Sequence, residues 1–470
     1  MNKSKILACL PFLMLGAAHA ALPAAPESPE PYKTMAHDML KSVIEVNSTH
    51  GKGTTVLAEM LATRLKQEGF ADADVTLVIP PEHPTKGNLV VRFHGKGQGK
   101  PLLFIAHLDV VEAKPEDWTV DPFKLTEKDG YFYGRGTQDM KDDDAALMVN
   151  LIRLKKESFV PNRDLIVAFT ADEEAGDDSN GVDYLLKNRR DLVDAEMVIN
   201  PDGGGGVASG DKRLNLSVQT SEKTFLTFWL EVTNKGGHSS LPEPDNAIYR
   251  LSAALGRVAK LSFPIRLNAT TRAYFAAAAK QEAGQLGMDL GAMAEGKADA
   301  AVLKRLQANI TYNAQLHTTC VATGIEGGHA ENALPQRARA MIQCRTLPDD
   351  SQATVQSILA KAVADPEVKI SVMTPARPGP ESVLSPKLQA KIQSVVDQMW
   401  PGVPVVPDMD AGASDSKYTR AAGMPSYGVT GMFIDMNDVR AHGRDERIVI
   451  DNYYQDVEFN YRLIKALTAE

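Results

Sequence analysis

The chain is poor in several features that mark common classes of protein. It has 3 cysteines in 470 residues, 6% aromatic residues, and no surplus of positive charge, since 51 Lys and Arg face 60 Asp and Glu. So few cysteines exclude a disulfide-rich scaffold. The net charge of −9 argues against nucleic acid or an anionic membrane surface as the main partner. A hydrophobic content of 43% is typical of a globular protein with a large core.

The first 20 residues have the pattern of a signal peptide. Lys3 and Lys5 precede an apolar run from Ile6 to about Ala18, and Ala18-His19-Ala20 has the form of a signal-peptidase site. The run is too short for a typical transmembrane helix, and no later run is longer. A buried N-terminal helix is the alternative. We expect a secreted or periplasmic protein, cleaved near Ala20 and without a stable membrane anchor, with a flexible proline-rich leader over residues 21–33.

A helical pattern follows the leader. From Thr54 to about Glu68 the apolar residues recur with helical spacing, which predicts a helix with one buried face. That face comprises Val56, Leu57, Met60, Leu61 and Leu65.

Further along, apolar strands alternate with helices, which predicts an α/β fold with a mostly parallel sheet. Three expected strands, 102–106, 165–170 and 197–200, run directly into acidic residues or histidine. In open α/β sheets the ligand site lies outside the carboxyl ends of the strands. The three strand ends are therefore expected to share one site.

The pattern changes near residue 222. Expected strands at 224–232, 314–325, 337–346 and 368–374, with helices at 246–260 and 352–364, form a small ferredoxin-like α+β sandwich. Between them, residues 270–310 are rich in alanine and helical in pattern. We expect a domain inserted at 222–377 into a catalytic domain made of residues 34–221 and 378–470.

Five residues form a set of nitrogen and oxygen ligands without cysteine. Each alone has a simpler interpretation, such as a helix cap, a solvated acidic loop or a turn. Together, two imidazoles and three carboxylates suit two zinc ions, with cobalt or manganese as possible substitutes. The five are His107, Asp139, Glu174, Asp202 and His442.

Nine short motifs, in order, resemble metallopeptidase family M20, the dinuclear-zinc exopeptidases and amide hydrolases. They are AHLDVV, GRGTQDMK, TADEEAG, NPDGG, GGHSS, ENALP, CRTLPD, GASDS and AHGRDE. The family includes glutamate carboxypeptidase, acetylornithine deacetylase, succinyl-diaminopimelate desuccinylase, carnosinase-type dipeptidases and aminoacylase. The resemblance runs from about residue 35 to the C-terminus. It implies a zinc-exopeptidase catalytic domain and an inserted lid or dimerisation domain.

The resemblance also implies a role for each motif residue. His107 and Asp202 would bind one zinc, Glu174 and His442 the other, and Asp139 would bridge both. The remaining roles are a general base, Glu173; a residue that orients His107, Asp109; an oxyanion-binding histidine, His238; and two residues that hold the substrate's carboxylate, Asn332 and Arg345.

The implied function is hydrolysis of a peptide or N-acyl amide bond next to a free carboxylate, with an N-acyl amino acid deacylase as the alternative. Aspartate at position 202 is the choice of the dipeptidase and N-acyl amino acid branches, whereas the deacetylase and desuccinylase branches use glutamate. The partners implied are a small peptide or N-acyl amino acid and, through the inserted domain, a second copy of the chain. A non-catalytic binding protein and a dinuclear-metal phosphoesterase are more distant alternatives.

Two cysteines remain once Cys9 leaves with the signal peptide. Cys320 and Cys344 lie at equal distances from a turn near Asn332, so an antiparallel hairpin would place them opposite each other. Export makes a bond possible. We expect buried free thiols, with a disulfide as the alternative.

Overall fold

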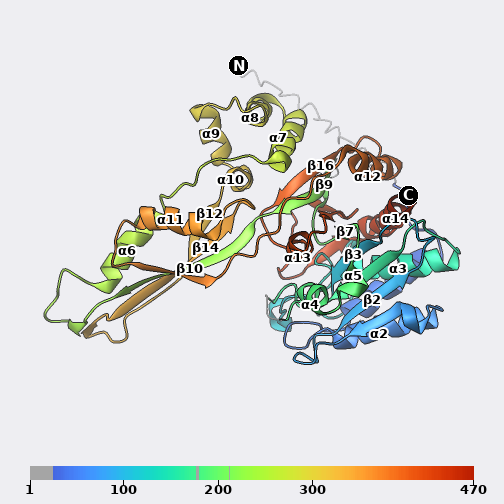
Figure 1. Cartoon of the computed structure of the whole chain (residues 1–470), viewed down its shortest axis with the longest axis horizontal. Coiled ribbons are helices and arrows are strands. Elements are labelled where there is room, and N and C mark those ends of the chain that lie inside the picture. The colour runs from blue at the N-terminus through green and yellow to red at the C-terminus, as the bar shows by residue number, and fades with distance from the viewer. Residues whose placement is uncertain (1–24, 176–178, 211, 470) are drawn as a thin grey trace, which may run out of the picture.

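The computed structural model describes residues 25–175, 179–210 and 212–469 (Figure 1). The expected signal peptide, residues 1–20, lies outside the described residues. In the part of the chain that is described, no helix is both long enough and apolar enough to cross a membrane.

The larger part of the molecule is built on a ten-stranded sheet. Its strands follow the order β1-β2-β6-β3-β7-β17-β9-β8-β18, and β16 pairs with β9. Strands β6 (Leu165–Thr170), β3 (Leu102–His107), β7 (Met197–Asn200) and β17 (Ser426–Gly428) are parallel at its centre. The expected α/β fold with a mostly parallel central sheet is confirmed. The outer strands are β1 (Val75–Val78), β2 (Asn88–Phe93), β8 (Gly205–Ser209), β9 (Lys212–Glu222), β16 (Val405–Asp410) and β18 (Phe433–Asp435).

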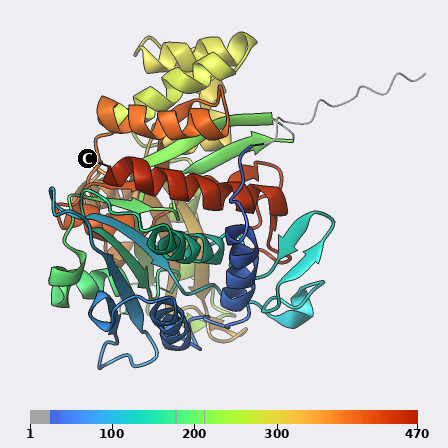
Figure 2. The same ribbon diagram turned by 90° about the vertical axis from the view of Figure 1, so that its right-hand side faces the viewer.

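Helices cover both faces of this sheet. One face packs against α1 (Tyr32–Ile44), α2 (Thr55–Gln67), α3 (Lys141–Lys156), α12 (Pro386–Met399) and α14 (Ile450–Thr468). Figure 2 shows α14, α3 and α1 lying against one another. The other face carries α4 (Gly181–Asn188), α5 (Arg190–Val193) and α13 (Ser416–Ala421). Both faces of the central strands are therefore buried, which explains their continuous apolar sequences.

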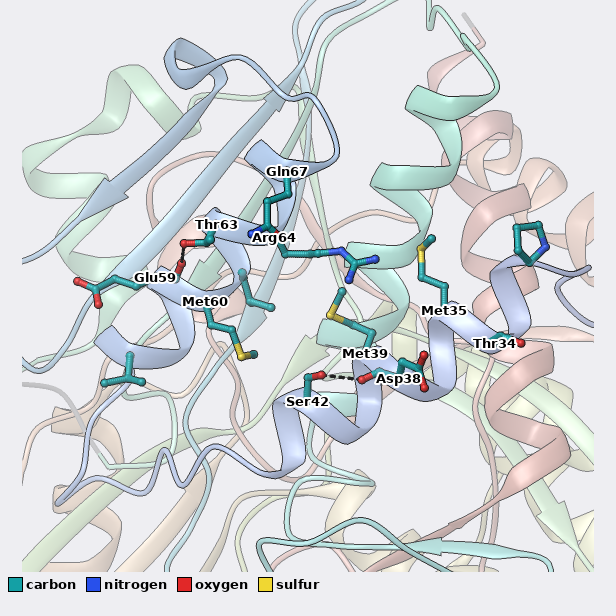
Figure 3. Close-up of a pocket in the computed structure, with 13 residues that line it drawn as sticks. Thr34, Met35, Asp38, Met39, Ser42, Glu59, Met60, Thr63, Arg64 and Gln67 are labelled. Carbon is teal, nitrogen blue, oxygen red and sulfur yellow. Dashed lines mark hydrogen bonds between the residues drawn. The ribbon is translucent and has the colours of Figure 1, made fainter.

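Helix α2 forms as expected, but its buried face differs from the expected one. Leu57, Leu61 and Leu65 are fully buried, whereas Val56 is 65% exposed. The buried residues follow a spacing of four, and Val56 lies about 100° around the helix from Leu57. Met60 lies in a groove of about 820 Å³ between α1 and α2, with Met39 opposite it (Figure 3).

The inserted unit has its own antiparallel sheet, in the order β12-β14-β10-β15. Its strands are β10 (Thr224–Thr233), β12 (Thr319–Gly327), β14 (Arg337–Thr346) and β15 (Lys369–Thr374), and α6 (Ala247–Val258) and α11 (Gln352–Val363) pack on one face. This is the expected α+β sandwich. Strand β12 begins later than expected because a helix, α10 (Ile310–Leu316), occupies the preceding residues.

The alanine-rich segment forms a small helical bundle. Helices α7 (Ala269–Gln281), α8 (Gly284–Ala294), α9 (Ala300–Gln307) and α10 share a core of their own around Phe275, Leu290 and Leu306. In Figure 1 the bundle lies beside β16 and β9. Gln315 donates a hydrogen bond of 2.7 Å to the carbonyl of Met409, which joins the bundle to the large sheet.

Short elements complete the described chain. A three-stranded sheet consists of β4 (Thr126–Lys128), β5 (Tyr131–Tyr133) and β19 (Arg447–Val449). Two single turns of 3₁₀-helix span Asp72–Asp74 and Pro115–Asp117.

Cys320 and Cys344 are joined by a disulfide bond. They are directly paired in the β12–β14 ladder, as expected from their spacing around the turn. The expectation of free thiols is wrong, because cross-strand neighbours on one rung hold the two sulfurs within bonding distance.

Candidate active site

Three adjacent parallel strands bring polar loops to one edge of the large sheet. Strand β6 pairs with β3, and β3 with β7. His107 ends β3, Glu173 and Glu174 follow β6, and Asp202 follows β7. Because the carboxyl ends of parallel strands meet at one edge, these side chains converge as the sequence predicts.

The convergence produces two groups of possible metal ligands that share one carboxylate. His107, Asp139 and Asp202 form one group, and Asp139, Glu174 and His442 form the other, with the ligand atoms of each group within 4.8 Å of one another. Asp139 Oδ1 is 3.0 Å from His107 Nε2, and its Oδ2 is 2.9 Å from His442 Nε2. His442 Nε2 is also 2.9 Å from Glu174 Oε1. One oxygen of Asp139 thus faces His107 in the first group, and the other faces His442 in the second.

His442 comes from a loop far along the chain, and buried contacts tie that loop to the Asp139 loop. The Arg135 guanidinium forms a buried ion pair with Glu446. Gln138 Oε1 accepts the backbone N–H groups of Arg440 and Ala441 at 2.8 Å. These bonds connect residues about 300 positions apart and hold the loop of His442 beside Asp139, so that His442 joins the second group.

Asp109 connects the loop after β3, in which it lies, with the loop after β6. Its carboxylate oxygens accept the backbone N–H groups of Glu173 and Glu174, both at 3.1 Å. The carboxylate is 3.8 Å from His107 Nδ1, whereas the backbone carbonyl of Asp109 is only 3.0 Å from that nitrogen. A carbonyl at this position favours a proton on Nδ1 and leaves Nε2 free as a ligand.

Crowded carboxylates shift the proton affinities of the site. Burial and the nearby carboxylates of Asp202 and Asp415 raise the pKa of Glu173 well above its usual value. Hydrogen bonds to Asp139 and Glu174 raise the pKa of His442 to about 10. Although burial opposes it, hydrogen bonds from His107 and His442 lower the pKa of Asp139. The buried acids of the site therefore interact strongly with one another and with the two imidazoles.

The residues fit a pair of divalent cations. Cations would relieve the repulsion among the buried carboxylates, and imidazole with carboxylate ligands suits zinc, cobalt or manganese. A carboxylate with one oxygen directed to each ligand group can bind two ions at once.

A cavity of about 430 Å³ lies beside this cluster, between the large sheet and the inserted domain. Glu173, Glu174 and His442 line one side, and Phe225 and Arg345 of the inserted sheet line the other. The Arg345 guanidinium lies 4.9 Å from the Phe225 ring centroid, and its Nη1 is buried without a hydrogen-bond partner among the described residues. An unsatisfied guanidinium donor in a cavity fits an anionic ligand group.

The cavity also contains cations that the sequence did not single out: Lys223, Arg377 and Lys417. Lys223 donates to the His317 carbonyl at 2.8 Å, and burial together with the neighbouring Arg345 lowers its pKa to about 8. The signal available in the sequence was a lysine at the start of the expected inserted domain, directly before the expected strand at 224–232.

His238 and Asn332 do not line this cavity. His238 lies in a two-stranded ladder of β11 (Gly237–His238) and β13 (Ala333–Leu334), and Asn332 directly precedes β13. The Ser239 N–H donates to the Asn332 carbonyl at 3.1 Å. Strand β10 begins at the cavity with Thr224 and ends at Thr233, so the loop after it starts about 30 Å away. Figure 1 shows this loop, between β10 and α6, at the end of the inserted domain that points away from the large sheet.

Comparisons with known proteins agree on one family. The model of peptidase family M20/M25/M40 matches residues 103–466. The chain is 27% identical to human N-fatty-acyl-amino acid synthase/hydrolase PM20D1 over 78% of its length and 74% of that protein. It is 29% identical to a probable carboxypeptidase S-like 2 of Dictyostelium discoideum, over 80% of this chain and 74% of that one.

Solved structures show the same fold. The M20 family metallo-carboxypeptidase Sso-CP2 of Sulfolobus solfataricus superimposes with a TM-score of 0.68 and 20% identity. The alignment covers 93% of this chain and 99% of the other. At this level of identity the likeness establishes the fold alone.

Proposed function

The chain belongs to peptidase family M20/M25/M40, and we propose that it is a dinuclear-zinc hydrolase that cleaves a peptide or N-acyl amide bond next to a free carboxylate. The observation that carries this proposal is the position of Asp139, which directs one oxygen to each ligand group. Hydrolysis of peptide or N-acyl amino acid bonds is supported by two relatives, an N-fatty-acyl-amino acid synthase/hydrolase and a probable carboxypeptidase.

The metal ligands are assigned from the two groups. His107 and Asp202 would hold one ion, Glu174 and His442 the other, and Asp139 both. When bound, such ions lower the pKa of water and polarise the carbonyl of the scissile bond. Zinc is the proposed ion, with cobalt or manganese as substitutes.

Glu173 acts as the general base in this proposal. It lines the cavity without belonging to either ligand group. Its carboxylate takes a proton from the attacking water and returns it to the nitrogen of the leaving amine.

Arg345 recognises the free carboxylate of the substrate. Its guanidinium borders the same cavity as Glu173, and a fork of two N–H donors matches a carboxylate. A peptide C-terminus and an N-acyl amino acid present the same carboxylate beside the amide bond. The deacylase alternative is favoured by PM20D1, and the peptidase by the carboxypeptidase relative.

The positions of His238 and Asn332 suggest how a second copy would contribute. These residues are exposed and lie far from the cavity of their own chain, on two adjoining segments of the inserted domain. We propose that two copies associate through this domain, so that His238 of one chain stabilises the oxyanion in the other and Asn332 helps to hold the carboxylate. Export to the periplasm is a further proposal, based on residues 1–20.

The test of the proposal is a metal-dependent substrate panel. Protein purified with and without a chelator, and then reloaded with zinc, is assayed with a dipeptide, an N-acyl amino acid and a phosphate ester. We expect cleavage of at least one amide substrate, loss of activity on chelation and recovery with zinc. Cleavage of the phosphate ester alone would favour a phosphoesterase, and tight binding without turnover would favour a binding protein.

A further inference from the structure

A buried lysine lies beneath the loop that carries the two active-site glutamates. The Lys86 side chain is only 7% exposed, and its ammonium group contacts Asp172 Oδ1 at 2.7 Å. It also donates to the His50 carbonyl at 2.7 Å and contacts His50 Nδ1 at 3.0 Å. An ammonium group has three donors. Two of those of Lys86 have an oxygen acceptor, and the His50 ring nitrogen beside the ammonium group also lies 3.3 Å from Asp172 Oδ1.

Asp172 is the residue directly before Glu173, and its backbone is in the left-handed region with φ of 55°. This conformation is uncommon outside glycine, although aspartate tolerates it better than most residues. Its side chain is fully buried and also accepts a hydrogen bond from the Ser179 hydroxyl. The turn that sends Glu173 and Glu174 into the site therefore depends on a carboxylate whose charge is compensated by Lys86.

Lys86 also connects this turn with the loop of His107. The His50 loop that Lys86 binds is fastened to the end of β3, because the Ser48 hydroxyl donates to the Leu108 carbonyl at 2.7 Å. The Val110 N–H donates to the Ser48 carbonyl at 3.3 Å. One ammonium group thus bonds directly to the turn before Glu173 and to the His50 loop, and that loop is in turn bonded through Ser48 to the segment after His107.

We propose that Lys86 is a positioning residue, whose ion pair with Asp172 fixes the Glu173–Glu174 turn against the His107 loop. The inference rests on the proposed function, in which Glu173 is the base and Glu174 a metal ligand. Because Arg345 lies on the inserted domain, loss of the pair should disturb turnover and metal affinity more than recognition of the substrate's carboxylate.

The test removes the ion pair as a unit. Lys86→Met alone would leave a buried, uncompensated carboxylate and can prevent folding. Lys86→Met/Asp172→Asn removes both charges, and asparagine accepts the left-handed conformation. We expect kcat to fall by about 10- to 100-fold, because small misplacements of reacting groups have effects of this size. KM should change by less than about threefold.

A second buried ion pair provides a matched control. Arg153 and Glu458 join α3 to α14 at 2.7 Å, with side chains 8% and 6% exposed, and neither lines the cavity. Arg153→Met/Glu458→Gln should lower thermal stability by a similar amount and leave kcat unchanged. A folded Lys86→Met/Asp172→Asn protein with wild-type kcat would overturn the proposal, as would an equal loss of kcat in the control.

Zinc binding gives a second readout that does not depend on activity. Titration of the metal-free proteins should show a loss of about 10- to 100-fold in affinity for one of two ions in Lys86→Met/Asp172→Asn, and no loss in the control. If wild type binds two ions but cleaves no amide, the proposed function fails while this test stands. If wild type is active and the double variant matches it in both readouts, only the positioning role fails.

Discussion

Glu173 and Glu174 are neighbours in sequence but have different surroundings. Glu174 contacts His442 at 2.9 Å within a ligand group, whereas Glu173 is surrounded by the carboxylates of Asp202 and Asp415. Glu173→Gln should therefore keep both metal ions and lower kcat by at least about a hundredfold, the low end for general acid–base catalysis. Elemental analysis and steady-state kinetics check this. The companion variant Glu174→Gln should lose metal, and the reverse pattern would exchange the two roles.

Arg345 provides a prediction about substrate recognition. Its buried Nη1 lacks a partner among the described residues, so a substrate carboxylate would satisfy it. Arg345→Ala should raise KM for free-acid substrates, corresponding to about 2–5 kcal/mol if the pair is buried. Comparison of kcat/KM for one substrate and its C-terminal amide, with both proteins, checks this. The mutation should barely affect the amide, and equal cleavage of acid and amide by wild type would contradict carboxylate recognition.

Whether a site residue could be predicted depends on how it is positioned. His107, Glu174 and Asp202 follow central strands, so the sheet alone brings them together. Lys86 gave no signal, because it lies in a loop and its role arises from contacts with residues 36 and 86 positions away. Contacts between residues so far apart in the chain produce no periodic pattern in the sequence, so they cannot be predicted from it.

At the scale of elements, boundaries were predicted more reliably than burial. Helices α2, α6 and α11 begin and end within one or two residues of the expected positions. The exposed Val56 shows why burial is harder: spacing identifies a stripe, but the width of the buried stripe depends on how closely the next helix packs. Here α1 leaves a groove beside α2 (Figure 3).

The disulfide gives a prediction for the β12–β14 hairpin. It closes a loop with a sequence separation of 24 residues, and loops of this size contribute about 3 kcal/mol in the chain-entropy model. Cys320→Ser/Cys344→Ser should lower the melting temperature of the inserted domain. Titration of unfolded, unreduced protein that lacks residues 1–20, and with them Cys9, should find no free thiol. Two free thiols would show that the bond does not form in solution.

Strand β16 carries a partly buried acid, Asp408, whose titration should affect stability. Burial and the nearby Asp410 raise the pKa of Asp408 from 3.8 to about 7. The folded state therefore binds a proton that the unfolded state releases, and this contribution to stability is lost as pH rises from about 4 to 7. The loss amounts to about 1.4 kcal/mol per pH unit in that window. Asp408→Asn should flatten the dependence of melting temperature on pH over this range, and an unchanged slope would contradict the shift.

At the scale of the whole molecule, the arrangement of the two domains decides which residues can act together. The sequence predicts that His238, Asn332 and Arg345 lie on one inserted domain. It does not predict which end of that domain faces the catalytic domain. In the structure Arg345 borders the cavity, while the loop with His238 lies at the opposite end of β10. Strand order and hairpin length fix this separation, and neither is encoded in the short motifs that identify the residues.

This separation leads to a prediction about assembly. If His238 acts on the metal site of a second copy, each active site needs residues from two chains, and the protein should be a dimer in solution. Glu173→Gln removes the base from its own site but leaves His238 available to a partner. His238→Ala does the reverse. Each variant alone should therefore be nearly inactive.

A mixture of the two variants, unfolded or dissociated and then reassembled, distinguishes the possibilities. Half of the dimers would contain one chain of each kind, and one of their two sites would have both Glu173 and His238. Activity should therefore recover to about a quarter of the wild-type value. If closure of the inserted domain instead brings His238 to its own site, no mixed dimer would contain an intact site, and the mixture would stay as inactive as its components.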